Sequence, residues 1–161
     1  MKGKQFIYLF AALLLPVCVF VFLKIFGKNE FAVEPLYVSE SPEISSGCDS
    51  VTVPYYVPDS VMNQLDFKKD SLVAVIFGNP DKAAQTQLKR IDEEFNKDAI
   101  HKVFVADQTH KTWRSCVFFM KTSNTLALVD YRGRIRGVYN PDDREDIDRL
   151  LTEITIILKK Y

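Results

Sequence analysis

The last third of the chain constrains the fold most, because it predicts a β-hairpin followed by an amphipathic helix. Residues 126–139 contain two apolar segments separated by a tight turn at Arg132-Gly133. Apolar residues then recur at helical spacing over about residues 142–158. A hairpin with one apolar face needs further strands and a covering helix to bury that face, so this ending predicts a sheet built with the middle of the chain.

The middle of the chain predicts a β-α-β unit. Residues 71–77 (SLVAVIF) form a continuous apolar run, which is typical of a central strand buried on both faces. Residues 102–106 (KVFVA) predict a second strand, parallel to the first through a right-handed crossover. The crossover helix is indicated by an apolar stripe at spacings of four, three and four: Ala84, Leu88, Ile91 and Phe95. The order β-α-β, then β-β-α, predicts an α/β fold.

A long apolar run near the N-terminus predicts a membrane anchor. Residues 6–26 are almost wholly apolar, and about 20 such residues in a helix span a hydrocarbon core of roughly 30 Å. A signal peptide and a lipoprotein acylated at Cys18 are the alternatives. Because lysines flank both ends of the run, the charge rule leaves the orientation nearly undecided. We expect an uncleaved single-pass anchor in contact with the lipid bilayer.

Composition divides the chain into four regions. We expect an N-terminus at 1–5, the transmembrane anchor at 6–26, a flexible spacer at 27–50 that is rich in Ser, Glu, Pro and Gly, and a folded domain at 51–161. The 21 basic and 21 acidic residues cancel, so no basic surplus indicates nucleic acid as a partner. Within the domain, residues 51–57 predict a short edge strand, and residues 117–120 a short strand or a packed turn.

The residues of the hairpin, 126–139, are similar to those of the Sco/SenC family, the thioredoxin-like proteins of cytochrome oxidase copper assembly. Residues 27–31 and 56–59 resemble two further segments of that family. The resemblance implies a thioredoxin-like domain, β-α-β plus β-β-α, behind one N-terminal transmembrane helix. It also implies a cytoplasmic N-terminus, a periplasmic domain on the inner (cytoplasmic) membrane, and a protein partner in a respiratory complex.

The chemistry that the resemblance implies depends on residues that this chain lacks. Sco-like proteins carry Cys-x-x-x-Cys-Pro in the turn after the first core strand, where a helix dipole lowers the thiol pKa, and a copper-binding His before the hairpin. Here the turn, residues 77–82, has no cysteine, and the family His falls near Thr122 or Ser123. We therefore expect a degenerate site with no catalytic residue, cofactor or metal, in a non-catalytic binding or assembly factor.

Cys48 and Cys116 are the thiols outside the apolar run. In an oxidising compartment they could form a disulfide that ties the spacer to the domain, or Cys116 could be a small buried apolar residue. An alternative function, a copper or thiol-disulfide chaperone, would use both cysteines, with His110 as a further copper ligand. Otherwise His101 and His110 are expected to be surface residues.

Four further residues are candidates for a docking surface. Trp113, in a polar segment, could be an exposed partner anchor or a lid over the core. Arg132, Arg134 and Arg136 alternate along the hairpin, and a period of two places all three on one side. That side is either a solvated face or a docking surface for an acidic partner or anionic head groups. The acidic residues at 142–146 fit compensation of a helix N-terminus better than a metal site.

Overall fold

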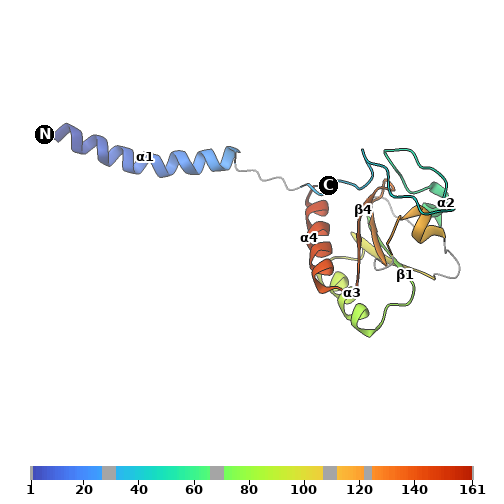
Figure 1. Ribbon diagram of the computed structural model, residues 1–161. Coiled ribbons are helices and arrows are strands. Elements are labelled where there is room, and N and C mark those ends of the chain that lie inside the picture. Colours follow the sequence, from blue (N-terminus) through green and yellow to red (C-terminus); the bar gives the residue numbers. More distant parts are fainter. Residues whose placement is uncertain (1, 27–31, 66–70, 107–111, 122–124, 161) are drawn as a thin grey trace. The chain divides into compact units, whose positions relative to one another are not determined.

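The structure is a computed structural model that describes residues 2–26, 32–65, 71–106, 112–121 and 125–160. The chain divides into two compact units, Met1–Phe31 and Ala32–Tyr161. The second unit contains the sheet (Figure 1). Residues 32–50, which the sequence assigned to the spacer, belong to this second unit, so the folded unit begins nearer to residue 32 than to the predicted residue 51.

The first unit contains helix α1 (Lys2–Phe26), which covers the predicted anchor. Among the residues that the structure describes, no helix is both long enough and apolar enough to cross a membrane. This finding contradicts the predicted transmembrane anchor at 6–26, and with it the single-pass location in the inner membrane.

The second unit is a small α/β domain with a four-stranded mixed sheet in the order β2-β1-β3-β4. Strands β1 and β2 are parallel, and β3 is antiparallel to β1 and β4. The predicted order of elements, β-α-β and then β-β-α, is therefore present, although the transmembrane helix of the predicted fold class is not. The elements are α2 (Asp59–Met62), η1 (Asn63–Leu65), β1 (Leu72–Phe77), α3 (Lys82–Glu94), β2 (Ile100–Val105), η2 (Trp113–Val117), β3 (Leu126–Val129), β4 (Ile135–Tyr139) and α4 (Arg144–Lys160).

Both faces of the sheet are covered, which explains why every residue of β1 and β3 is buried. Helices α3 and α4 cover one face (Figure 1), and we call this the helical face. The other face, which we call the loop face, is covered by residues 36–37, 51–65 and 113–120. The continuous apolar runs of the central strands follow from this double coverage, because alternate side chains enter two separate cores.

The helical face follows the sequence pattern closely. The predicted stripe of α3 is buried at Ala84, Leu88 and Ile91, and α4 buries Ile147, Leu150 and Ile154. Asp81 caps α3, because its Oδ1 accepts a hydrogen bond from the Ala84 N–H at 2.8 Å. Asp143 lies directly before α4, and its Oδ1 accepts a hydrogen bond from the Glu145 N–H at 2.9 Å.

Tyr139 joins the sheet to α4 in an arrangement that requires glycine two residues earlier. Its hydroxyl donates a hydrogen bond to Glu153 Oε2 at 2.6 Å. Its ring lies back over Gly137, where an added Cβ would come within 2.6 Å of Tyr139 Cζ. Burial first, and then the Glu153 carboxylate, raise the pKa of Tyr139 far above its usual range, so this hydroxyl stays protonated and keeps donating.

The loop face departs from the sequence prediction. Residues 51–57 were expected to form an edge strand, but the structure has a loop there with a cis Val53–Pro54 bond. Its backbone bonds go to other loops: the Tyr55 N–H donates to Tyr37 O at 2.9 Å, and the Val57 N–H to Gly133 O at 2.8 Å. Proline cannot donate to a sheet ladder, which explains why this apolar segment packs on the sheet without joining it. Residues 118–120 form the predicted packed turn, buried throughout.

Candidate functional site

The turn between β1 and α3 lies where a sheet of this kind commonly carries its functional site. The Phe77 N–H donates to Thr125 O at 2.8 Å, and the Gly78 N–H to Val105 O at 3.0 Å, so the turn joins the carboxyl ends of β1 and β2 to the start of β3. Gly78 has φ +77°, a conformation that favours glycine and turns the chain toward α3. Ligands of open α/β sheets bind preferentially at this edge.

A cavity of 290 Å³ lies beside this turn, and its lining carries carboxylate, amide and hydroxyl groups. The polar lining residues are Asn79, Asp81, Thr125 and Asp142. The Asp81 carboxylate already accepts the capping bond of α3, so one of its oxygens serves the helix. No lining residue is a cysteine, and none is a histidine. The turn can therefore hold a small polar group by hydrogen bonds, but it offers no thiolate for exchange or for copper.

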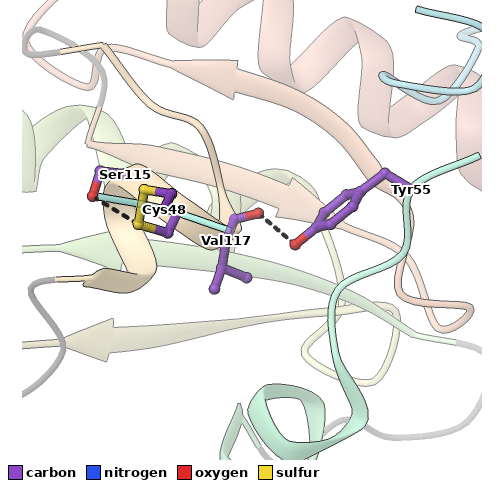
Figure 2. Close-up of a disulfide and its surroundings, with 5 residues drawn as sticks. Cys48, Tyr55, Ser115 and Val117 are labelled. Atoms are coloured by element: carbon purple, nitrogen blue, oxygen red, sulfur yellow. Dashed lines mark hydrogen bonds between the residues drawn. A yellow bond between two sulfur atoms is a disulfide. The ribbon is translucent and has the colours of Figure 1, made fainter. Parts of the chain in front are cut away.

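The two cysteines of the second unit lie elsewhere, and the structure joins them. Cys48 and Cys116 form a disulfide with a Cα–Cα distance of 5.3 Å across 68 positions of sequence (Figure 2). Next to this bond, the Tyr55 hydroxyl donates to Val117 O at 3.0 Å. Neither cysteine lines the cavity beside the turn. The disulfide therefore ties residues 48 and 116 together on the loop face, away from the place where the resemblance put a redox site.

An aromatic cluster fills the loop face beside the disulfide. The rings of Tyr37, Tyr55 and Phe119 meet edge to face, with centroid distances of 4.9 Å for Tyr55–Phe119 and 5.3 Å for Tyr37–Phe119. Burial raises the pKa of Tyr55 to about 12. It also raises the pKa of Tyr37, with a further contribution from the nearby Glu43 carboxylate. Both hydroxyls are thus fixed in the neutral form in this cluster.

Trp113 lies at the start of η2 and is partly buried against the same core. This position fits a lid over the core, one of the two predicted alternatives, better than an exposed anchor for a partner. The signal in the sequence was a large aromatic residue four positions before the run Val117-Phe118-Phe119, whose members are largely buried. The sequence placed Trp113 in a polar segment, and in the structure the described residues from Thr112 onward lead into the helical turn η2.

The hairpin arginines do not share one exposed side, contrary to the predicted period of two. Arg136 is only 5 % exposed, and Arg134 is partly buried. The register of β3 with β4 shifts between Leu128 and Val129, which makes Arg136 the extra residue of a bulge. A bulge breaks the period of two on which the prediction depended. Only Arg132, at the tip of the turn, remains exposed.

Asp130 is the reason why these arginines can be buried, and the sequence reasoning missed it. Its carboxylate is fully buried and accepts hydrogen bonds from the N–H groups of Arg132 and Arg134, each at 3.0 Å. It also pairs with the guanidinium groups of Arg134, at 2.8 Å, and Arg136, at 3.4 Å. Arg136 in turn donates to Val33 O. An acidic residue at the end of an apolar strand, followed by three arginines, was the available signal.

One of the two histidines, His101, differs from its predicted place on the surface. His101 lies on β2, and both of its ring nitrogens are buried without a hydrogen-bond partner. His110, Thr122 and Ser123 lie outside the described residues. Within the described residues, no group of three His, Cys, Asp or Glu side chains is placed to hold a metal ion. The residues at the turn therefore do not fit the copper that the resemblance implies.

No family model, curated protein or solved structure matches this chain. The Sco/SenC and thioredoxin-like assignments thus gain no support from comparison with known proteins. What the structure itself defines is a small α/β domain with a mixed four-stranded sheet and one disulfide across its loop face.

Proposed function

We propose that this chain is a non-catalytic, Sco-like binding module that acts as an assembly factor for a respiratory complex. One observation carries the proposal: the turn after β1 has no sulfur, and both cysteines of the second unit are used in the Cys48–Cys116 disulfide. Thiol exchange needs a thiolate as the attacking group. A domain that keeps the scaffold without this group is suited to binding a partner.

Two further observations support the proposal. The elements follow the order β-α-β, then β-β-α, which is the order that the resemblance of residues 126–139 implies. The cavity at the turn is lined by hydrogen-bonding groups and apolar side chains, which suits recognition. The respiratory partner is inferred from the resemblance of the hairpin residues.

A thiol-disulfide chaperone is the second candidate, because Cys48 and Cys116 are both partly exposed and already bonded to each other. In such an activity a thiolate of a reduced partner would attack one sulfur and release the other as a thiolate. A second thiolate of the partner would then resolve the mixed disulfide, leaving the partner oxidised and both cysteines reduced. Against this candidate, η2 places Cys116 in a short helical turn that ends at Val117, so no long helix begins at either sulfur to lower its pKa.

An exchange assay separates the two candidates. The purified chain is mixed with a model dithiol or disulfide, and the rate is compared with that of a Cys48→Ser/Cys116→Ser variant. The proposal expects equal and slow rates, because the disulfide is structural. A wild-type rate near that of an oxidoreductase, lost in the variant, would rule out the non-catalytic function. Titration of the reduced chain with Cu(I) gives a second readout, and tight stoichiometric binding that needs both cysteines would favour the chaperone.

The partner is tested separately by affinity purification. Tagged full-length chain is incubated with detergent-solubilised membranes, recovered and probed for bound respiratory-complex subunits, with the Asp130→Ala variant as a misfolding control. Enrichment of oxidase subunits with wild type alone supports the assembly function. Good recovery of the bait without any respiratory subunit contradicts it.

A further inference from the structure

We propose that the outer edge of β2 is a docking site for an extended acidic segment of a partner protein, which adds to the sheet as a further strand. The proposal deepens the binding function proposed above by naming the surface and the chemistry of its partner. It depends on three features of the second unit: an unpaired strand edge, a groove beside it, and the charges around that groove.

The backbone of β2 presents hydrogen-bonding groups on its outer side. β2 is the first strand in the sheet order, with β1 as its neighbour. The Leu72 N–H donates to Ala99 O and the Gly78 N–H to Val105 O, which shows that the odd-numbered residues of β2 bond to β1. The N–H and C=O groups of Lys102 and Phe104 therefore point outward. Within the described part of the chain, no residue bonds to these outward groups.

The opposite edge of the sheet shows how this protein covers a strand. The Leu36 N–H donates to Ile135 O of β4 at 2.8 Å, and Val33 O accepts from the Arg136 guanidinium. Residues 33–36 thus lie along the β4 edge. An uncovered edge is a template for a further strand, and natural proteins usually block it with charges, prolines or bulges. Over its described length, β2 carries neither a proline nor a bulge.

A groove of 620 Å³ runs between β2 and α3 beside this edge. Its floor includes Leu88 and Val105, which are nearly fully buried. Phe104 forms a wall of the groove and is 57 % exposed. An incoming strand would bury this ring, since alternate side chains of an added strand pack on the same face as Phe104 and Lys102. The groove thus supplies a side-chain contact next to the free backbone groups.

Charge selects the kind of segment that fits. Lys102 also lines the groove, but its Nζ is bonded to Asp92 Oδ2 at 2.6 Å and to Leu88 O at 3.1 Å. Lys89 is exposed on the rim, and no described carboxylate pairs with it. A second copy of this chain would bring its own lysines to the same place, where like charges repel. A partner segment with a carboxylate near Lys89 is complementary instead.

Peptide binding to the ¹⁵N-labelled full-length chain tests the proposal by NMR. The probes are two short capped peptides that alternate valine with a charged residue, glutamate in one and lysine in the other. We expect saturable shifts centred on the amides of Lys102 and Phe104, with the glutamate peptide binding about tenfold more tightly. N-methylation of the peptide on its β2-facing edge should abolish binding, whereas N-methylation on the other edge should not.

Two substitutions assign the effect to side chains. Phe104→Thr keeps a good strand former and removes the ring, and it should weaken the glutamate peptide about tenfold or more. Tyr56→Thr is the matched control, because Tyr56 is also an exposed aromatic residue, and it should leave the affinity unchanged. Lys89→Glu should reverse the preference between the two peptides.

Two outcomes would overturn the proposal. The first is that neither peptide shifts the Lys102 and Phe104 amides at millimolar concentration. The second is that sedimentation finds a dimer whose β2 amides are already protected from exchange without peptide, which assigns the edge to a second copy. Because this titration does not depend on the thiol assay, the docking site and the non-catalytic function can each fail without the other.

Discussion

The two faces of the sheet are stabilised in different ways. On the helical face, α3 and α4 satisfy their own backbone groups, so that coverage needs only apolar stripes such as Leu88 and Ile91. On the loop face, irregular segments must satisfy buried backbone groups one at a time. They do so through individual links, such as Val57 N–H to Gly133 O and the Cys48–Cys116 bond. Both faces bury an apolar core, and the loop face adds specific cross-links between its irregular segments.

Substitution of Asp130, which pairs with two arginines of the hairpin, should lower the free energy of unfolding most. Asp130→Ala leaves the guanidinium groups of Arg134 and Arg136 without their buried carboxylate, and it should lower the free energy of unfolding by about 4 kcal/mol. Urea unfolding followed by circular dichroism measures the change. Asp142→Ala, at an exposed position, is the control and should change stability by less than about 0.5 kcal/mol. If Asp130→Ala also lowered the free energy of unfolding by less than about 0.5 kcal/mol, the buried ion pairs would not be needed for stability.

A cavity in the core of the helical face should lower the free energy of unfolding by nearly as much. This loss should not depend on the disulfide. Ile154 is fully buried between α4 and the sheet, so Ile154→Ala should destabilise the domain by about 3 kcal/mol. The same loss is expected with the disulfide intact or reduced, because the two cores lie on opposite sides of the sheet. Thr152→Ala on the exposed side of α4 serves as the control. A strong dependence on reduction would show that the two faces are coupled.

Loss of the disulfide should affect the loop face selectively. Cys48→Ser/Cys116→Ser should cost about 2–3 kcal/mol, because the bond restricts a long loop of the unfolded chain. Hydrogen exchange should become faster at residues 48–57 and 113–120, while α3 and α4 stay protected. Cys18→Ser, which removes the exposed free thiol, should change neither quantity. Equal acceleration in the helices would contradict the division into two faces.

Alkaline pH should lower the free energy of unfolding through the buried tyrosines, of which Tyr55 lies on the loop face. A folded pKa of about 12 for Tyr55, against an ordinary value near 10, means that the folded state favours the neutral phenol. This contribution to stability is fully present below pH 10 and is lost as the pH rises through 12. Stability measured between pH 9 and 12 should therefore decline.

Tyr55→Phe gives the control for the pH effect. The variant loses the hydrogen bond to Val117 O, which should cost about 1 kcal/mol at pH 7, and its decline above pH 10 should be shallower than that of wild type. Tyr56→Phe, at an exposed position, should behave as wild type. An unchanged slope in Tyr55→Phe would assign the alkaline transition to the other buried tyrosines, Tyr37 and Tyr139.

The helical face could be predicted from sequence, because its order is local. The stripe of α3 and the apolar runs of β1 and β3 each reflect one repeated geometry, and the structure places them within a few residues of the predicted bounds. The N-terminal run was harder to interpret. Its composition predicted a membrane span over residues 6–26, and the described helices do not include one.

The loop face could not be predicted in the same way, because its order depends on single long-range contacts. The burial of Arg136 depends on Asp130 and on a bulge in β4, neither of which has a periodic signal. The open edge of β2 was missed for a related reason: residues 51–57 were expected to form an edge strand, and they pack on the loop face instead. The contact between Cys48 and Cys116 has no periodic signal either. The pair was considered because these are the thiols outside the apolar run.

The contact between Gly137 and Tyr139 limits which substitutions the family of this chain could accept. Any side chain at position 137 would collide with the phenol ring, and removing the ring alone would remove the hydroxyl that donates to Glu153 and leave a gap against α4. Neither position can therefore change first without a loss of stability. In distant homologues we expect positions 137 and 139 to vary as a pair, so that a larger residue at 137 occurs only where the aromatic ring at 139 has been replaced.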